Sequence, residues 1–170
     1  MDTLTLTDYH QRVTEFLRDS LEITVLDSYP DTDHFPDCSA LLTVIDWDAS
    51  PDHSVCGELS VVLNCTIIVV IPRSLPKPEI AVKDYAMYLS LKINDNTLGL
   101  PFEPARFISA SPEPFAPVLD DYLVWSVNFA HRVRMGSHAE PAFDRPEKIL
   151  VGVSPDNGPE HQDAYEVLHE

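Results

Sequence analysis

The sequence predicts an α+β fold: a single, mostly antiparallel β-sheet with two α-helices packed on one face, a long β-hairpin and an irregular C-terminal extension. Two segments, 8–21 and 79–93, carry apolar residues at helical spacing, and several others alternate apolar and polar residues as half-buried strands do. Residues 137–170 carry scattered prolines and acids with little periodicity. Because loops join most successive strands, antiparallel pairing is favoured, and the two helices are expected to cover one face of the sheet.

The most informative segment is 120–136 (DDYLVWSVNFAHRVRMG), which alternates along nearly its whole length. One face carries Leu123, Trp125, Val127, Phe129, His131 and Val133, and the wetter face carries Val124, Ser126, Asn128, Ala130, Arg132 and Arg134. About 13 residues at ~3.3 Å each span roughly 43 Å, which matches the ~40 Å diameter of a compact domain of this size. A strand that crosses its whole domain usually pairs with something outside it, so we expect an assembly subunit.

The first helix is expected to begin at Thr7, whose hydroxyl can cap the backbone, with the Asp8 carboxylate favoured by the helix dipole. Its apolar stripe is Tyr9, Val13, Phe16, Leu17 and Leu21. Residues 23–26 then form a short strand, and 27–39 form a loop rich in Asp and Pro.

The centre of the chain predicts two strands. Residues 40–48 (ALLTVIDWD) form the first, 49–55 form a loop, and 58–71 form a second long strand. Pro72 ends this strand, because proline cannot donate to the ladder. We expect this strand to pair with 120–136, so that the two project as one long hairpin.

The second helix is predicted over 79–93, with an apolar stripe of Val82, Tyr85, Ala86, Leu89 and Ile93. Residues 94–99 end it with chain-breaking residue types. Residues 106–111 form a strand, and 112–117 form a wide turn with three prolines.

The domain organisation follows from the change of character after Gly136. We expect one α+β domain over 1–136 and a C-terminal extension over 137–170 with no core of its own. Within the extension, 148–153 is strand-like and 163–168 is expected to form a helical turn.

Composition narrows the function classes. The chain has 170 residues, with 11 basic and 28 acidic ones and a net charge of −17. That charge repels phosphates, which disfavours sequence-independent binding to nucleic acid. Three cysteines do not indicate a disulfide scaffold, and neither a signal core nor a run of ~20 apolar residues is present. We therefore expect a soluble protein of a reducing cytoplasm, with no membrane partner.

Motifs for chemistry are sparse, since the five glycines are scattered and no nucleophile elbow stands out. His34 and Cys38, with His53 and Cys56, have spacings compatible with a tetrahedral zinc site if their two loops meet. The alternative, which we favour, is that these are polar loops of an acidic protein. We expect no catalytic residue, no cofactor and no metal.

Other residues also have competing interpretations. Asp46 and Asp48 are expected to be a solvated strand end rather than a catalytic pair. Trp47 is either a buried lid or an interface anchor, and His131 is expected to face inward as a hydrogen-bonded core or interface residue. Arg132 and Arg134 face outward, into solvent or into an ion pair with a neighbouring subunit.

The closing strand carries a tryptophan and ends in a basic-then-glycine stretch: Trp125, Val127, Phe129, Arg132, Arg134 and Gly136. With the preceding helix, long strands and second helix, the order of elements from Thr7 to Gly136 resembles the tail terminator proteins of long-tailed bacteriophages. The resemblance covers about three quarters of the chain and rests on order and pattern. The C-terminal extension has no counterpart in the family pattern.

The resemblance implies a virion protein of the tail or neck, assembled in the host cytoplasm. Such a protein forms a ring, typically of six subunits, that caps the tail tube, stops its polymerisation and provides the surface for head joining. Its partners are further copies of itself, the tube protein, a head-completion or neck protein and the sheath, while DNA passes through the lumen.

We expect subunit contacts at Trp47, Arg73, Val124, Ser126, Asn128, Arg132 and Arg134. One alternative is another head–tail connector or tail-completion subunit of the neck. A second alternative is a small metal-dependent hydrolase that uses Asp37 and Asp52 with the two histidine loops.

Overall fold

The computed structural model divides the chain into two compact units, Met1–Ala139 and Glu140–Glu170, which are described separately. The structure describes residues 4–21, 23–28, 35, 38–51, 57–113, 121–136 and, by their backbone, 149–151 and 166–169. Among these residues, no helix is long and apolar enough to cross a membrane.

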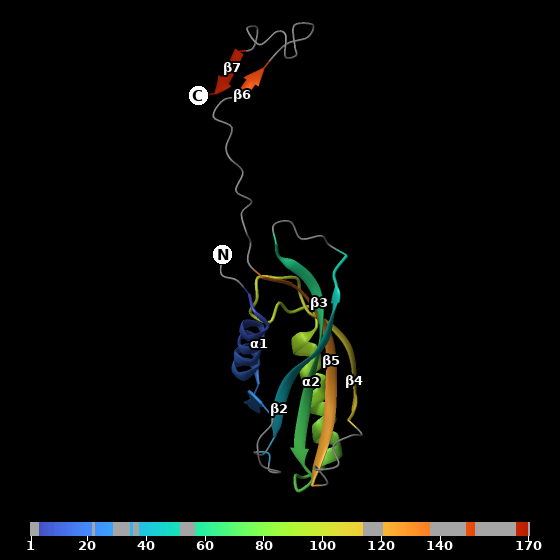
Figure 1. The fold of residues 1–170 in the computed structure, drawn as a ribbon. Coiled ribbons are helices and arrows are strands. Elements are labelled where there is room, and N and C mark those ends of the chain that lie inside the picture. The colour runs from blue at the N-terminus through green and yellow to red at the C-terminus, as the bar shows by residue number, and fades with distance from the viewer. Residues whose placement is uncertain are drawn as a thin grey trace. The chain divides into compact units, whose positions relative to one another are not determined.

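The first unit contains a five-stranded sheet with the order β1-β2-β3-β5-β4 (Figure 1). Its strands are β1 (Thr24–Leu26), β2 (Ser39–Ala49), β3 (Leu59–Pro72), β4 (Arg106–Pro112) and β5 (Tyr122–Met135). Only β1 and β2 are parallel, and the other three pairs are antiparallel. The predicted α+β fold with one mostly antiparallel sheet is confirmed, and this sheet is open.

The two long strands, β3 and β5, pair over their full length, from Leu59 opposite Met135 to Pro72 opposite Tyr122. The predicted pairing is therefore correct, but the predicted hairpin is wrong, because α2 and β4 lie between these strands in the chain. The hairpin of consecutive strands is β2–β3 instead, closed by residues 50–58.

The cap of helix α1 (Leu6–Ser20) lies two residues before the expected cap at Thr7. Thr5 is the cap: its hydroxyl accepts from the Asp8 backbone, while the Asp8 carboxylate accepts from the Thr5 backbone. This reciprocal pair satisfies two backbone donors that the helix itself leaves open. The Thr5 hydroxyl and the Thr5 backbone N–H both donate to the Asp8 carboxylate, and these two hydrogen bonds lower the pKa of that carboxyl.

Helix α2 (Pro78–Ile93) follows Lys77, whose φ of 50° is left-handed, and carries Glu79 in its first turn. A proline fits the first helical position because its missing N–H is one that the helix would not use. After Ile93 the chain reverses through Asp95 and Leu98, which also have positive φ angles.

The main core lies on one face of the sheet, under both helices. Alternate residues of β3 from Val61 to Ile71 point into it, and so do Val127, Phe129 and Val133 of β5. Helix α1 contributes Tyr9, Val13 and Leu17, and α2 contributes Val82, Ala86, Leu89 and Ile93. The expected arrangement of two helices on one face is confirmed.

The opposite face is not uniformly wet, in contrast to the simple alternation expected from the sequence. Phe35, Val70 and Tyr122 form a second, smaller core cluster there, and Val124 packs against it. The Tyr122 hydroxyl accepts from the Phe35 backbone N–H at 3.2 Å, which helps hold residue 35 over this end of the sheet.

The second unit contains a two-stranded antiparallel sheet of β6 (Ile149–Val151) and β7 (Glu166–His169). The strand-like character predicted for 148–153 is thus confirmed over the described residues 149–151. The helical turn expected over 163–168 is wrong where the chain is described, because 166–169 forms a strand. Valine, which is favoured in strands, is one reason, and pairing with β6 supplies the backbone hydrogen bonds.

Candidate subunit interface

The sheet exposes strand edges on both sides. On one side, β1 pairs only with Ser39–Leu41, so within the described part of the chain Thr43–Ala49 of β2 has no neighbouring strand on that side. On the other side, β4 is the last strand. An unpaired strand presents a row of backbone donors and acceptors and is a template for another chain.

Each of the two edges carries a β-bulge with an exposed isoleucine. In β2 the register shifts between Val44 and Asp46, and the extra residue, Ile45, is 61% exposed. In β4 the register shifts between Phe107 and Ser109, and the extra residue, Ile108, is 56% exposed. Bulges re-aim side chains, and here they turn two large apolar groups toward solvent.

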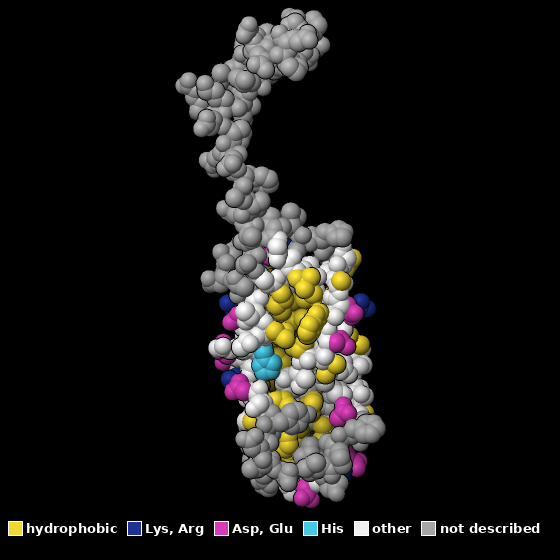
Figure 2. Space-filling model, viewed as in Figure 1, with side chains coloured by type: hydrophobic (Ala, Val, Ile, Leu, Met, Phe, Trp, Pro, Cys, Tyr) yellow, Lys and Arg dark blue, Asp and Glu magenta, His cyan; other side chains and the backbone are white. Residues whose placement is uncertain are grey.

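Trp47 strengthens the apolar character of the β2 edge. It pairs with Leu63, on the sheet face that carries the helices, yet it is 56% exposed. The buried-lid interpretation of Trp47 is therefore wrong. Figure 2 shows hydrophobic side chains gathered on the face toward the viewer, over the region that β2 crosses in Figure 1. Exposed apolar patches of this kind often mark interaction sites.

A second exposed apolar surface lies on the solvent side of α2. Ile80, Met87, Tyr88 and Leu91 are exposed there, and the Lys92 ammonium lies 5.3 Å from the centre of the Tyr88 ring. Lys83 and Asp84 are also exposed on α2, so its solvent side mixes charged and large apolar residues where an ordinary surface helix is mainly polar. The two apolar surfaces belong to different elements.

The helix-free face of the sheet carries a hydrogen-bonded polar network. Asn64 donates to the Asp46 carboxylate at 2.6 Å and to the Asp48 carboxylate at 3.1 Å. Thr66 donates to Asn128 at 2.6 Å, and Asn128 donates to Ser109 at 3.2 Å. These contacts link β2, β3, β5 and β4 across the sheet, and they show that Asp46 and Asp48 are engaged with Asn64.

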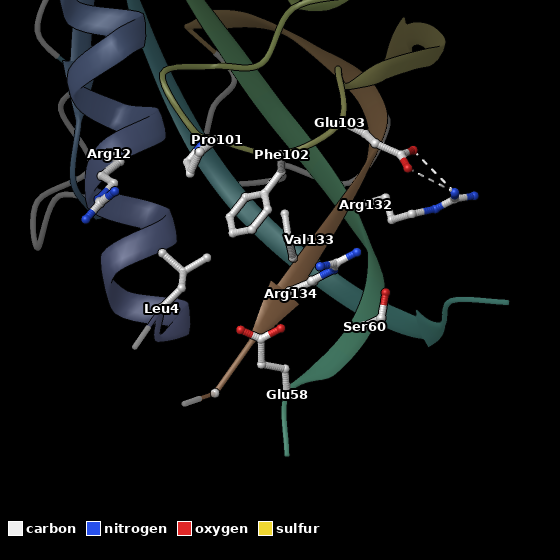
Figure 3. Close-up of a pocket in the computed structure, with 11 residues that line it drawn as sticks. Leu4, Arg12, Glu58, Ser60, Pro101, Phe102, Glu103, Arg132, Val133 and Arg134 are labelled. Carbon is white, nitrogen blue, oxygen red and sulfur yellow. Dashed lines mark hydrogen bonds and ion pairs between the residues drawn. The ribbon is translucent and has the colours of Figure 1, made fainter. Parts of the chain in front are cut away.

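Three arginines line a groove of about 680 Å³ where β5 ends (Figure 3). Arg12 comes from α1, and Arg132 and Arg134 come from β5, with Glu58 and Glu103 completing the charged lining. The Arg132 guanidinium lies 3.3 Å from the Glu103 carboxylate. Arg132 therefore has an acidic partner within its own chain, where the sequence suggested solvent or a neighbouring subunit.

Behind this groove lies a buried hydrogen-bonded network. His131 Nε2 lies 2.9 Å from the Glu103 backbone oxygen, and its Nδ1 lies 3.1 Å from the Tyr9 hydroxyl. Burial lowers the pKa of His131 and raises the pKa of Tyr9, and it raises the pKa of Cys65, 3.6 Å from that hydroxyl, to about 11. All three groups are therefore neutral at neutral pH, and the inward orientation expected of His131 is confirmed.

The seven residues expected at a subunit interface do not form one patch. Val124, Ser126, Asn128, Arg132 and Arg134 share the helix-free face of β5, as predicted. Ser126 is buried and Val124 packs in the second core cluster, so these two are less accessible than expected. Trp47 lies on the opposite face, and Arg73 follows the far end of β3, about 40 Å along the strands from Arg134.

Most of the candidate metal ligands, His34, His53 and Cys56, lie outside the described residues, as do Asp37 and Asp52. Cys38 is described and is half-buried. In the described part of the chain, no group of three or more His, Cys, Asp or Glu side chains is placed to hold a metal ion. The predicted zinc site stays untested, because three of its four ligands lie outside the described residues.

Sequence reasoning did not single out Ile45, Ile108 or Arg12. A signal existed for Ile45, because the adjacent apolar residues Val44 and Ile45 interrupt the alternation. The pair Leu41 and Leu42 interrupts it in the same way, yet both are buried. Adjacent apolar residues thus do not reveal a bulge without the partner strand.

Comparison with known proteins adds one structural likeness. No protein-family model matches the chain, and no curated protein matches it. Among solved structures, it is similar to the sheath/tube terminator of PVC, an extracellular contractile injection system, in its extended state, determined by cryo-electron microscopy. The sequences are 18% identical, the TM-score is 0.44, and the match covers 95% of this chain and 68% of the other.

Proposed function

We propose that this protein is a structural subunit of a phage-type tail or neck and acts as a tail terminator. In this role it forms a ring on the end of the tail tube, most simply of six copies, and performs no chemistry. The observation that carries the proposal is an open sheet that exposes two bulged edges with large apolar side chains. The order of elements from Thr7 to Gly136, which resembles that of phage tail terminators, supports the same assignment.

The mechanism of such a subunit is capping by shape. Copies joined head to tail form a closed ring when the rotation between neighbours allows it. One ring face then takes the place of the next tube subunit and stops polymerisation, while the other recruits a head-completion or neck protein, and the rim meets the sheath. This places the protein in the virion tail or neck after assembly in the host cytoplasm.

Two separate exposed surfaces support an assembly role. A ring subunit needs one kind of contact with its own copies and another with the tube or neck. The sheet edges around Ile45 and Ile108 suit the first kind, and the apolar outer side of α2 around Met87 and Leu91 suits the second. An ordinary monomer rarely exposes large contiguous apolar surfaces.

The charge of the chain suits a lumen through which DNA slides. A net charge of −17 per copy gives a ring a strongly negative field, which disfavours adhesion of the phosphate backbone. Arg132 is paired with Glu103 in the same chain, which reduces its availability to phosphates.

Mass measurement in solution and electron microscopy with purified tail tubes test this proposal together. We expect a ring-sized oligomer, or ring density at one end of the tubes, and tubes of limited length when the protein is present during polymerisation. A strict monomer at high concentration that also leaves tube ends bare would contradict it. Density at the portal side alone would favour the neck-subunit alternative.

A further inference from the structure

We propose that the free edge of β2, Thr43–Ala49, pairs in antiparallel fashion with the β4 edge, Arg106–Pro112, of a second copy of this chain. The pairing continues the sheet from one copy to the next, head to tail. The closure of such contacts into a ring rests on the proposed function. The contact between two copies is argued from the two edges alone.

The two edges match in length and character. Each runs for seven residues, and each contains one bulge with an isoleucine more than half exposed. The β2 edge adds Trp47, a residue type that is enriched at the centres of interfaces. Edge strands of soluble proteins are normally protected by charge, proline or a covering element. Asp46, Asp48 and the bulge give the β2 edge part of this protection, but within the described residues no other element covers the stretch around Ile45 and Trp47.

The direction of the pairing follows from the sheet itself. Strand β2 is antiparallel to β3, β3 to β5, and β5 to β4, so β4 is antiparallel to β2. A copy placed beside the first by continuing the sheet keeps these directions. Its β4 therefore meets β2 in antiparallel orientation, and the stronger ladder geometry forms without turning either chain over.

The register of the pairing brings opposite charges together. Asp46, Asn64, Ala130 and Arg106 lie in one row across four strands, on the helix-free face. The next copy cannot continue this row, because its Ala110–Pro112 would then lie opposite Ala40–Leu42, where β1 already pairs with Ser39–Leu41. A shift of two residues keeps every residue on its face and places Arg106 one strand spacing, about 4.8 Å, from Asp48. Asp46 lies two residues away along β2 on the same face and reinforces the attraction. Opposite charges across strands stabilise a pair.

The same charges disfavour a symmetric alternative. Two β2 edges paired around a two-fold axis would bring Asp46 and Asp48 of both copies against one another, and like charges across strands destabilise. Two β4 edges would lack an acidic partner for Arg106, since that strand carries no acid. The complementary pair is therefore β2 with β4, which is a head-to-tail contact.

The decisive experiment mixes two blocked variants. Ile45→Lys/Trp47→Lys places charges on the β2 edge, and Arg106→Glu/Ile108→Glu places acids on the β4 edge. Each variant keeps one intact edge, but every copy of it lacks the complementary edge. Each variant alone is therefore expected to be monomeric, with a mass of 19.1 kDa by light scattering. An equimolar mixture is expected to form a heterodimer of about 38 kDa, which is 2 × 19.1. All four side chains are exposed, and circular dichroism confirms folding.

Met87→Lys/Leu91→Lys on α2 is the matched control, because it replaces two exposed apolar residues with lysine away from both edges. It is expected to oligomerise as the wild type does. Loss of association in this variant, with both edge variants still oligomeric, would overturn the edge pairing. Oligomers of one edge variant alone would also overturn it, because they require a contact other than β2 with β4.

A charge exchange tests the register. Asp48→Arg and Arg106→Asp are each expected to weaken association at least tenfold, and the double variant is expected to recover most of the loss. No recovery in the double variant would contradict the pairing of Asp48 with Arg106 of the next copy. A wild type that is monomeric and leaves tail tubes unbound would instead refute the proposed function, whereas a wild-type ring unaffected by every edge variant refutes only this inference.

Discussion

His131 Nε2 lies 2.9 Å from the backbone oxygen of Glu103, and this contact ties the connection between α2 and β4 to strand β5. A carbonyl oxygen only accepts, so Nε2 carries the proton and Nδ1 accepts from the Tyr9 hydroxyl at 3.1 Å. The imidazole thus joins α1, β5 and the segment that presents Glu103 to Arg132. The shape of the arginine groove depends on this buried contact.

Removing the imidazole is expected to destabilise the fold. His131→Leu leaves the Glu103 carbonyl and the Tyr9 hydroxyl without their partner, and a buried unsatisfied group costs about 1–3 kcal/mol. We expect the free energy of unfolding in urea to fall by about 2 kcal/mol or more. Tyr9→Phe removes one hydroxyl only and is expected to cost about 1 kcal/mol. Equal stability of His131→Leu and the wild type would show that the network does not contribute.

The same histidine predicts a dependence of stability on pH. Burial lowers the pKa of His131 in the folded protein below its ordinary value of 6.5, so the unfolded chain binds the proton more tightly. The contribution is complete above about pH 6.5 and is lost as the pH falls through the folded pKa. The imidazole contacts the Tyr9 hydroxyl and the Glu103 backbone oxygen. Cys65 lies next to that hydroxyl, and Arg132 pairs with the Glu103 carboxylate.

This pH effect is measurable by comparing urea midpoints at pH 7.5 and pH 5.5. The wild type is expected to lose more stability than His131→Gln over this interval, because the variant has no imidazole to protonate. Subtracting the stability loss of the variant from that of the wild type removes the contribution of the carboxylates, because both proteins contain them. Equal losses in both proteins would contradict the assignment.

The position of the first helix cap gives a third prediction. Thr5→Ala removes the hydroxyl that accepts from the Asp8 backbone, and the loss of such a cap costs about 1 kcal/mol. Thr7→Ala is the matched control, because Thr7 is exposed inside the helix, where alanine is the better helix former. Thermal unfolding is expected to show a lower midpoint for Thr5→Ala only. A larger loss for Thr7→Ala would restore the cap expected from the sequence.

Two leucines of β3 test the assignment of the core face. Leu63 is 1% exposed and Leu59 is 57% exposed. Leu63→Ala is expected to lower the free energy of unfolding by about 2–5 kcal/mol, because it removes buried methyl groups and leaves a cavity. Leu59→Ala is expected to change it by no more than about 0.5 kcal/mol. Similar losses for both variants in urea unfolding would place the register of β3 in error.

Part of the interface was readable from the sequence and part was not. The helix-free face of β5 was predictable, because alternation is local and Asn128, Arg132 and Arg134 mark it. The ion pair of Arg132 with Glu103 was not, because the two residues are 29 positions apart. The exposure of Ile45 depends on a bulge, which exists only relative to the partner strand β3.

By itself, the sequence determined the two helices, the five strands of the sheet and the residues of the two long strands that face the helices, because periodicity and chain-breaking residues act over a few neighbours. Only the tertiary structure decided that Thr5 rather than Thr7 caps α1, that β2 rather than β5 forms the hairpin with β3, and that the sheet ends in two open edges. Each of these three features depends on hydrogen bonds of the backbone. Their partners are set by how the chain folds in space, and residue type alone does not identify them. The row from Asp46 to Arg106 has the same origin, since register across four strands is a property of the assembled sheet.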